Sequence, residues 1–519
     1  MIVGTIGSPR RADVRGGGTI VLHPGTADEI TVEWWIGADD RWHVPARAVT
    51  ARQHLVRNMP IVQTSVRIPS GDAIASVFGA VQGPRELVVL DVENRSKLPF
   101  ALAVVLRGPG VRDVTVAGSV VKVGGFPLVH LPRSPQRTAC VRSGEDLEQV
   151  VTSGAATAEL PKIEGPCEAA FLVPVTHSTT ARVGLLLGAS ATVALMGAPV
   201  LGSLPDVHAL ANGWALQLAR GMTIRLPDAA RNDRFESLAA GLLLAAEPLT
   251  VDGGETMLDR AVIAELLDLA GFHAEAGALL EDAPDRQGSR GSFVDRRVTG
   301  VSDEAVTASV VRALGTHAAL SGDAVFASTM APTVGAALEF LLKRAKKDPS
   351  AKLWVAACRS AADLFAVAND GRAAKQSMRA WEVNGADWPL PALLLPALPA
   401  MSVGGELVPS APQRLAAAMR ELLESVAAVD GDGAVDLLRG FVPEWRGQSI
   451  EARNIPTAAG RLSFALRWHG ANAALLWDVV PIEDRAGLSA EPLRLRASAI
   501  DPSWAGNGAK GDALLTPRR

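Results

Sequence analysis

The sequence contains no tyrosine, only three cysteines and no long run of one charge. Cys140, Cys167 and Cys358 are far apart, odd in number and not arranged as CxxC, which argues against a disulfide framework and against a cysteine zinc site. The charges almost cancel, with 51 Lys and Arg against 55 Asp and Glu. A broad nucleic-acid surface needs clustered positive charge, so nucleic acid is not an expected partner.

Several chemical motifs are missing as well. The nine histidines are scattered, with no HExxH or HxH, so we expect no metal site. GxSxG and the phosphate-loop pattern are absent, and we predict no dinucleotide, nucleotide or other cofactor. The N-terminus lacks an apolar stretch after its basic start, so it does not resemble a signal peptide. With the low cysteine content, this favours the cytoplasm.

Residues 183–205 carry no charge over 23 positions, which is long enough to span a bilayer. The stretch nevertheless holds four glycines together with Pro199 and Pro205, and it lacks the dense Leu, Ile and Phe of a typical span. Two buried strands joined by a Gly-Ala-Ser turn explain it as well. We favour buried sheet over a membrane segment.

Residues 1–226 carry short runs rich in Val, Ile and Thr, broken at regular intervals by Gly, Pro and Asp. This spacing predicts an N-terminal β-sandwich. Trp34 and Trp35 are adjacent within one such run, so they point to opposite faces of a strand. We expect one of them in the core and the other against a neighbouring domain.

From 227 to 430 apolar residues recur at helical spacing, as in LDRAVIAELLDLAG (258–271), where Gly271 marks a C-terminal stop. About nine such segments with short connections predict a toroid or solenoid of helical hairpins. Residues 431–485, with the hairpin-like RLSFALRWHGANAALLWDVV (461–480), predict a small C-terminal β-module. We expect the Pro-, Gly- and Arg-containing stretch 486–519 to be loosely ordered.

A β-sandwich, then helical hairpins, then a small β cap resembles the layout of six-hairpin glycosidases, notably bacterial glucoamylase-like enzymes. The amino-acid sequence of residues 234–246, 258–293 and 302–326 resembles that of the first helices of the family. AKLWVAACRSAADLFAVAND (351–370) resembles the family helix that opens with Leu-Trp-Glu. The resemblance implies a supersandwich-like N-terminal domain and an (α/α)6 toroid that binds sugar at its mouth. Hydrolysis there would need two carboxylates flanking the scissile bond.

This sequence differs from the glucoamylase-like family at the positions that carry the family's chemistry. Asp259 and Arg260 stand where the family has an Arg-Asp pair that clamps the terminal sugar, and the inverted order re-aims both side chains. The residue after Leu353-Trp354, the general acid in the family, is Val355, which cannot donate a proton. The Pro-Glu-Gln-like loop that supplies the family's general base has no counterpart with a glutamate.

Other acids remain as candidate catalytic residues: Asp303, Glu304, Glu382 and Asp387. Asp303 and Glu304 begin a helix, where capping by Ser302 and the helix dipole explain them equally well. Glu382 and Asp387 lie in WEVNGADWP. An acid beside a tryptophan is typical of a surface on which a sugar ring stacks, and equally of a packed structural loop. The candidate substrate-binding residues are Asp259, Arg260, Trp354 and Trp388.

We therefore predict a glycosidase-like protein of carbohydrate metabolism that is catalytically degenerate, and that binds a carbohydrate or small glycoside or acts as a scaffold. One alternative is an active glycoside hydrolase of the α-glucoside type that uses the four carboxylates above. Another is a protein-interaction scaffold built on the helical hairpins. The substrate, the linkage and the oligomeric state are not determined by the sequence.

Overall fold

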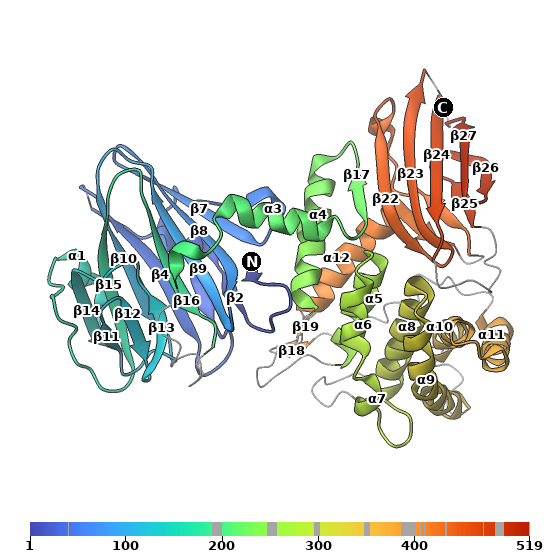
Figure 1. The fold of residues 1–519 in the computed structure, drawn as a ribbon, viewed down its shortest axis with the longest axis horizontal. Coiled ribbons are helices and arrows are strands. Elements are labelled where there is room, and N and C mark those ends of the chain that lie inside the picture. The colour runs from blue at the N-terminus through green and yellow to red at the C-terminus, as the bar shows by residue number, and fades with distance from the viewer. Residues whose placement is uncertain are drawn as a thin grey trace. The chain divides into compact units, whose positions relative to one another are not determined.

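The computed structural model describes residues 1–39, 41–188, 200–246, 257–294, 302–346, 353–385, 401–403, 406–408, 411–430, 433–470, 472–482 and 493–517. The chain divides into two compact units, Met1–Ala215 and Leu216–Arg519. Strands dominate the first unit, and the second combines helices with smaller sheets (Figure 1). The predicted multidomain β plus α fold is confirmed.

The first unit contains two eight-stranded antiparallel sheets. One has the order β1-β2-β3-β4-β10-β15-β14, with β5 paired to β4. Its strands are β1 (Ile2–Gly4), β2 (Arg11–Val14), β3 (Ile20–Leu22), β4 (Ile30–Gly37), β5 (Trp42–His43), β10 (Phe100–Arg107), β14 (Arg137–Arg142) and β15 (Cys167–Val175).

The other sheet has the order β11-β12-β13-β16-β9-β8-β7-β6. Its strands are β6 (Arg52–Leu55), β7 (Ile61–Ile68), β8 (Gly71–Gln82), β9 (Arg85–Asn94), β11 (Thr115–Ala117), β12 (Val120–Val123), β13 (Phe126–His130) and β16 (Thr180–Leu186). The described helices of this part of the chain are η1 (Gly16–Gly18), η2 (Pro45–Arg47), η3 (Val56–Asn58), α1 (Leu147–Thr152), η4 (Leu201–Ser203) and α3 (Val207–Leu218).

The two adjacent tryptophans of β4 are both fully buried, on opposite faces of their sheet. Trp34 belongs to the large core cluster that both sheets share, and its indole N–H donates to the Gly17 carbonyl oxygen at 3.1 Å. Trp35 belongs to a second cluster that includes Leu147 and Val151 of α1. The expectation that one tryptophan lies against a neighbouring domain is therefore wrong, because α1 of the same unit covers the outer face.

The uncharged stretch 183–205 begins inside β16, where Val183 and Leu185 are buried in the sandwich core. This part is buried sheet, as predicted, and residues 189–199 lie outside the described residues. Among the described helices, α9 (Ala324–Ala345) has the length and apolar composition that a membrane span would need. Its buried residues recur every three or four positions, the pattern of an amphipathic helix that lies on a protein core.

His130, at the end of β13, is a buried histidine in the first unit. Its side chain is 4% exposed, and its Nδ1 atom has no hydrogen-bond partner among the described residues. Burial, assisted by the nearby positive charge of Arg85, lowers the pKa of His130 to about 4. The imidazole is therefore neutral in the folded protein at neutral pH.

We expect this histidine to make the first unit less stable as the pH falls from 6.5 to about 4. In that window the unfolded chain binds a proton that the folded chain rejects, so the free energy of unfolding decreases by up to about 3 kcal/mol. Denaturant unfolding at several pH values measures the slope, and His130→Gln should flatten it. A variant whose slope equals that of the wild type would contradict the assignment.

The second unit contains the helical hairpins. Its helices are α4 (Ala229–Ala245), α5 (Met257–Leu269), α6 (His273–Leu280), α7 (Ala283–Arg286), α8 (Asp303–Ser321), α9 (Ala324–Ala345), α10 (Leu353–Val367), α11 (Gly371–Gly385) and α12 (Ala411–Val426). Successive helices pack in pairs, α5 with α6, α8 with α9 and α10 with α11 (Figure 1). α8 packs between α5 and α10, and α12 packs against α4 and α5.

Local signals set the helix ends as the sequence predicted. Ser302 caps α8 by accepting a hydrogen bond from the Ala305 N–H at 3.2 Å. Gly322 follows α8 with a φ of 73°, and Gly271 follows α5 with a φ of 86°. A side chain at either position would be strained in this left-handed conformation, which favours glycine as a helix stop.

Three small sheets complete the second unit. A five-stranded sheet has the order β17-β22-β23-β24-β27, a four-stranded one β20-β21-β25-β26, and β18 pairs with β19. The strands are β17 (Thr223–Arg225), β18 (Met401–Val403), β19 (Glu406–Val408), β20 (Ala427–Val429), β21 (Val435–Leu437), β22 (Ile450–Thr457), β23 (Gly460–His469), β24 (Asn472–Val480), β25 (Arg494–Ala497), β26 (Asp501–Asn507) and β27 (Lys510–Leu515). A 3-10 turn, η6 (Pro443–Trp445), precedes β22.

The predicted hairpin at 461–480 is confirmed as β23 and β24, with His469 opposite Asn472 at the turn. Phe464 and Leu466 are buried on one face, and the Trp468 ring stacks on Phe441 at 6.2 Å. The stretch 486–519 is more regular than expected, since its described part forms β25, β26 and β27. Pairing of β27 along β24 supplies the order that the polar composition did not indicate.

Candidate functional site

Asp303 and Glu304 lie in the first turn of α8. The Glu304 carboxylate is 2.8 Å from Nε of Arg344 on α9, so it forms an ion pair between the two helices. The Asp303 carbonyl oxygen accepts a hydrogen bond from the Thr307 hydroxyl at 2.6 Å, which is a bond within the helix. Acids in the first turn also interact favourably with the helix dipole. These contacts explain both residues as part of the helix start.

Glu382 lies near the end of α11, and its side chain is exposed. Within the described residues, no hydrogen bond or ion pair joins it to Asp303 or Glu304. Asp387 and Trp388 lie outside the described residues. Asp303 and Glu304 thus share the start of α8 and Glu382 lies on α11, and the assignment of the four carboxylates as catalytic residues stays a prediction.

Asp259 and Arg260, the predicted sugar clamp, lie in α5 and are 8% and 4% exposed. Arg260 donates from Nη2 to the Leu279 carbonyl oxygen at 2.8 Å and to Asp282 at 2.9 Å. Asp282 also pairs with Arg286 of α7 at 2.7 Å. Arg260 therefore ties α5 to the end of α6 and to the start of α7, which is a structural role.

The Leu353-Trp354-Val355 segment opens α10. Val355 is 1% exposed, so the residue that follows Leu353-Trp354 is a buried aliphatic side chain. The Trp354 side chain is half-buried, and its indole N–H has no hydrogen-bond partner among the described residues. Between Trp354 and Asp363 the sequence contains no other acid.

A buried charged cluster, which the sequence did not single out, joins three helices of this unit. Glu265 of α5 forms ion pairs with Arg312 of α8 and with Arg420 of α12, the latter at 3.1 Å. All three residues are less than 9% exposed. Burial opposes the ionisation of Glu265, but the two guanidinium groups together hold its pKa below the usual value. Glu265 is therefore an ionised carboxylate that cannot serve as a proton donor.

A second buried group lies one helical turn further along α5. The Asp268 carboxylate is fully buried and contacts Nδ1 of His273 at 2.8 Å and Nδ1 of His317 at 2.9 Å. The His317 ring packs edge-on against Phe326, with 4.5 Å between the ring centroids. One carboxylate thus links α5, α6 and α8.

A sequence signal for both groups existed, because Glu265 and Asp268 interrupt the apolar stripe of α5 at positions that the helical period places inside. A buried acid needs a cationic or hydrogen-bonding partner, so the position of these two acids within the apolar stripe implied that each has such a partner. Among the described residues, no group of three or more His, Cys, Asp or Glu side chains is arranged to hold a metal ion. The buried acids link α5 to α6, α8 and α12.

Known structures define the class of this fold. The chain has a glycosidase-like fold, and one similar structure is a bacterial glucoamylase in complex with acarbose, with a TM-score of 0.51 and 12% sequence identity. The match covers 74% of this chain and 65% of the glucoamylase chain. This confirms the predicted resemblance at the level of the fold.

A second similar structure is an α-L-rhamnosidase from Dictyoglumus thermophilum, with a TM-score of 0.40 and 9% identity, covering 82% of this chain and 61% of that one. Its score is too low to support an argument, so the fold assignment rests on the glucoamylase. No protein-family model matches the sequence, and no curated protein matches it either. The chain spans about 65% of the length of the glucoamylase.

Proposed function

We propose that this chain is a glycosidase-like protein that binds carbohydrate without hydrolysing it. The proposal is carried by Val355, a buried valine that follows Leu353-Trp354, where the sequence resemblance places the general acid of the glucoamylase-like helix. Protonation of the leaving oxygen needs a carboxylic acid beside the scissile bond, and an aliphatic side chain cannot replace it.

The other acids of the helical unit support this proposal. A general acid needs a raised pKa, so that it still holds a proton at neutral pH. The environment of Glu265 has the opposite effect, because Arg312 and Arg420 lower its pKa. Glu304 is paired with Arg344, and Glu382 is an exposed side chain on a different helix. The carbohydrate ligand is inferred from the fold and from the acarbose bound to the similar glucoamylase.

Turnover and binding assays on the full chain test the proposal. We expect no release of product above the buffer rate from 4-nitrophenyl α-D-glucoside or from maltotriose, with a bacterial glucoamylase as the positive control. We expect acarbose or a neutral oligosaccharide to bind with a Kd in the micromolar to millimolar range, corresponding to about 4–8 kcal/mol, by isothermal titration calorimetry.

Matched variants separate a real activity from contamination. If product is released, Asp303→Asn, Glu304→Gln and Glu382→Gln are assayed beside Glu281→Gln, an exposed glutamate just after α6. Loss of turnover in one of the first three, with retention in the last, would identify an active hydrolase and overturn the proposal. If the chain neither hydrolyses nor binds a glycan, the part of the proposal that says it binds carbohydrate would be overturned.

A further inference from the structure

A cleft of about 920 Å³ lies within the first unit, and none of the residues that the glycosidase resemblance indicates lines it. Strands β6, β7, β8, β9 and β16 contribute residues to it, as do η3, η4 and the start of α3. Its volume falls within the range of ordinary small-molecule sites, roughly 300–1,000 Å³. The cleft is therefore large enough for a short oligosaccharide.

A row of polar side chains crosses five neighbouring strands at the base of this cleft. Direct cross-strand partners follow one another along the row in the order His54, Gln63, Ser76, Asp91 and Arg182. The residues on either side of Ser76, Asp91 and Arg182 belong to the sandwich core, so alternation directs this row to the outer face of the sheet. The row is consequently a polar surface held on a rigid sheet.

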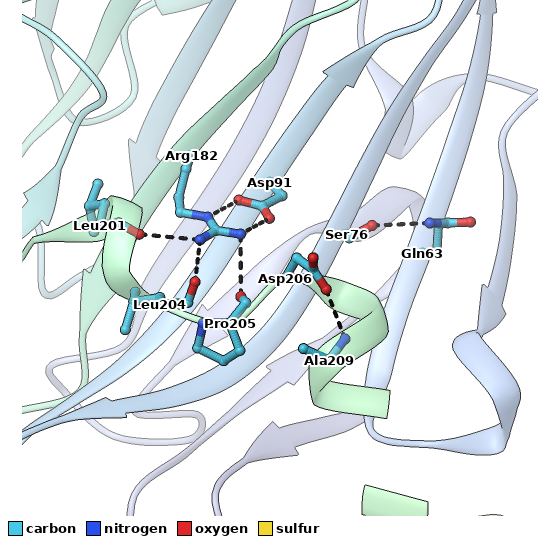
Figure 2. Close-up of polar contacts among 9 residues, drawn as sticks. All are labelled: Gln63, Ser76, Asp91, Arg182, Leu201, Leu204, Pro205, Asp206 and Ala209. Atoms are coloured by element: carbon cyan, nitrogen blue, oxygen red, sulfur yellow. Dashed lines mark hydrogen bonds and ion pairs between the residues drawn. The ribbon is translucent and has the colours of Figure 1, made fainter. Parts of the chain in front are cut away.

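Arg182 holds one wall of the cleft in place (Figure 2). Its Nε and Nη2 atoms donate to both oxygens of Asp91, at 2.8 and 2.7 Å. Its remaining bonds go to the carbonyl oxygens of Leu201, Leu204 and Pro205, at 3.2, 2.9 and 3.3 Å. All five guanidinium N–H donors are thus used within the protein, and Arg182 positions η4 and the start of α3 instead of contacting a ligand.

Other side chains of the cleft keep hydrogen-bonding capacity for a ligand. Within the described residues, the side chains of His54, Thr180 and His208 make no hydrogen bonds. Glu93 lies two residues beyond Asp91 on β9 and receives one bond from Arg95 at 2.8 Å, which leaves its second oxygen as an acceptor. The cleft therefore offers both donors and acceptors to a ligand.

The charges of the lining residues balance. Three arginines, at positions 57, 95 and 182, match three acids, at positions 91, 93 and 206. The apolar lining is aliphatic, and it includes Val56, Leu131 and Leu201. A cleft with no excess charge does not favour a polyanion. Its mixture of donors and acceptors matches the hydroxyl groups of a sugar, and its aliphatic side chains match the C–H faces of a sugar.

We propose that this cleft binds a neutral carbohydrate, with Glu93 and Thr180 as hydrogen-bonding residues and Arg182 as the residue that positions the wall. The inference rests on the proposed function for the class of ligand, and it adds a location in the β-sandwich outside the helical unit. The expected mode of binding is a sugar lying along the polar row, with its hydroxyl groups directed to the sheet.

Calorimetric titration of the full chain with maltotriose, and with an unsulfated glucuronate-containing trisaccharide as an anionic comparison, tests the cleft. The double variant Glu93→Gln and Thr180→Val should raise the Kd for the neutral sugar about tenfold or more, because it removes one charged acceptor and one hydroxyl group. Glu164→Gln, an exposed acid of the same unit that does not line the cleft, should leave the Kd unchanged. Melting curves of both variants check that each is folded.

The outcomes separate the two proposals. An unchanged Kd in the double variant would overturn the cleft assignment and leave the proposed function standing. Binding of the anionic sugar alone would overturn the inference of a neutral ligand. If the folded wild-type chain binds no glycan at all, the cleft assignment fails together with the binding half of the proposed function.

Discussion

Replacing Glu265 with glutamine is expected to lower the free energy of unfolding of the second unit by about 3–5 kcal/mol. The substitution removes the carboxylate that neutralises Arg312 and Arg420, while both guanidinium groups remain buried. Denaturant unfolding followed by tryptophan fluorescence measures the loss, and native-state hydrogen exchange of α5, α8 and α12 assigns it to these helices.

Two controls show whether charge is the cause. Glu281→Gln makes the same chemical change at an exposed site and should alter stability by no more than about 0.5 kcal/mol. The triple variant Glu265→Leu, Arg312→Met and Arg420→Met removes all three charges and should recover most of the stability, since no buried charge is left uncompensated. A triple variant as unstable as Glu265→Gln would point to shape, and not charge, as the main role of the cluster.

Gly315→Ala in α8 is expected to destabilise the protein by about 1–3 kcal/mol or more, although alanine is the better helix former. A Cβ atom at this position would lie 2.6 Å from Cβ of Ser360 on α10 and would overlap the Ser360 carbonyl group. The clash involves backbone, so the two helices would have to separate. Thermal unfolding should show a lower Tm.

Gly335 in α9 is the matched control for this change. No atom lies within 4 Å of a Cβ atom placed there, and the residue has no left-handed φ. Gly335→Ala should therefore stabilise the protein by about 0.5–1 kcal/mol, through helix propensity and the reduced freedom of the unfolded chain. We therefore expect Gly315→Ala to lower the stability of the protein and Gly335→Ala to raise it. Equal stabilisation by both would mean that α8 and α10 do not approach each other closely at Gly315.

The sequence predicts individual elements well where the signal is local. The start of α8 at Ser302 and its end at Gly322 follow from capping chemistry alone. Strands β9 and β10 likewise coincide with short apolar runs of the sequence, and both are almost continuously buried. These features depend on a few neighbouring residues, so no tertiary information is needed.

The sites depend on contacts that a local pattern does not encode. Glu265 meets partners 47 and 155 positions away, on α8 and α12. Helical periodicity predicts which face of α5 is buried, but it does not say which other helices meet that face. The polar row of the cleft needs the registers of five strands, and a shift by one residue in any of them would turn its side chain to the core.

The same limit applies to the order of the last residues. Strand β27 contains no β-branched or aromatic residue and so has little intrinsic preference for a strand, and its pairing with β24 supplies the regular structure. Trp35 is a comparable case, since the short helix α1 that covers it lies far along the chain. In both cases a distant segment provides the partner.

The pairing of β17 with β22 has a consequence for biosynthesis. Thr223 lies opposite Arg453, so the first strand of the five-stranded sheet is made before all the helical hairpins and its partner after them. At an elongation rate of about 5–20 residues per second, β17 waits on the order of 10–50 s for β22 to be synthesised. The sheet is completed only when β27, close to the C-terminus, pairs with β24. A chain that lacks β22 would therefore display β17 with an unpaired strand edge.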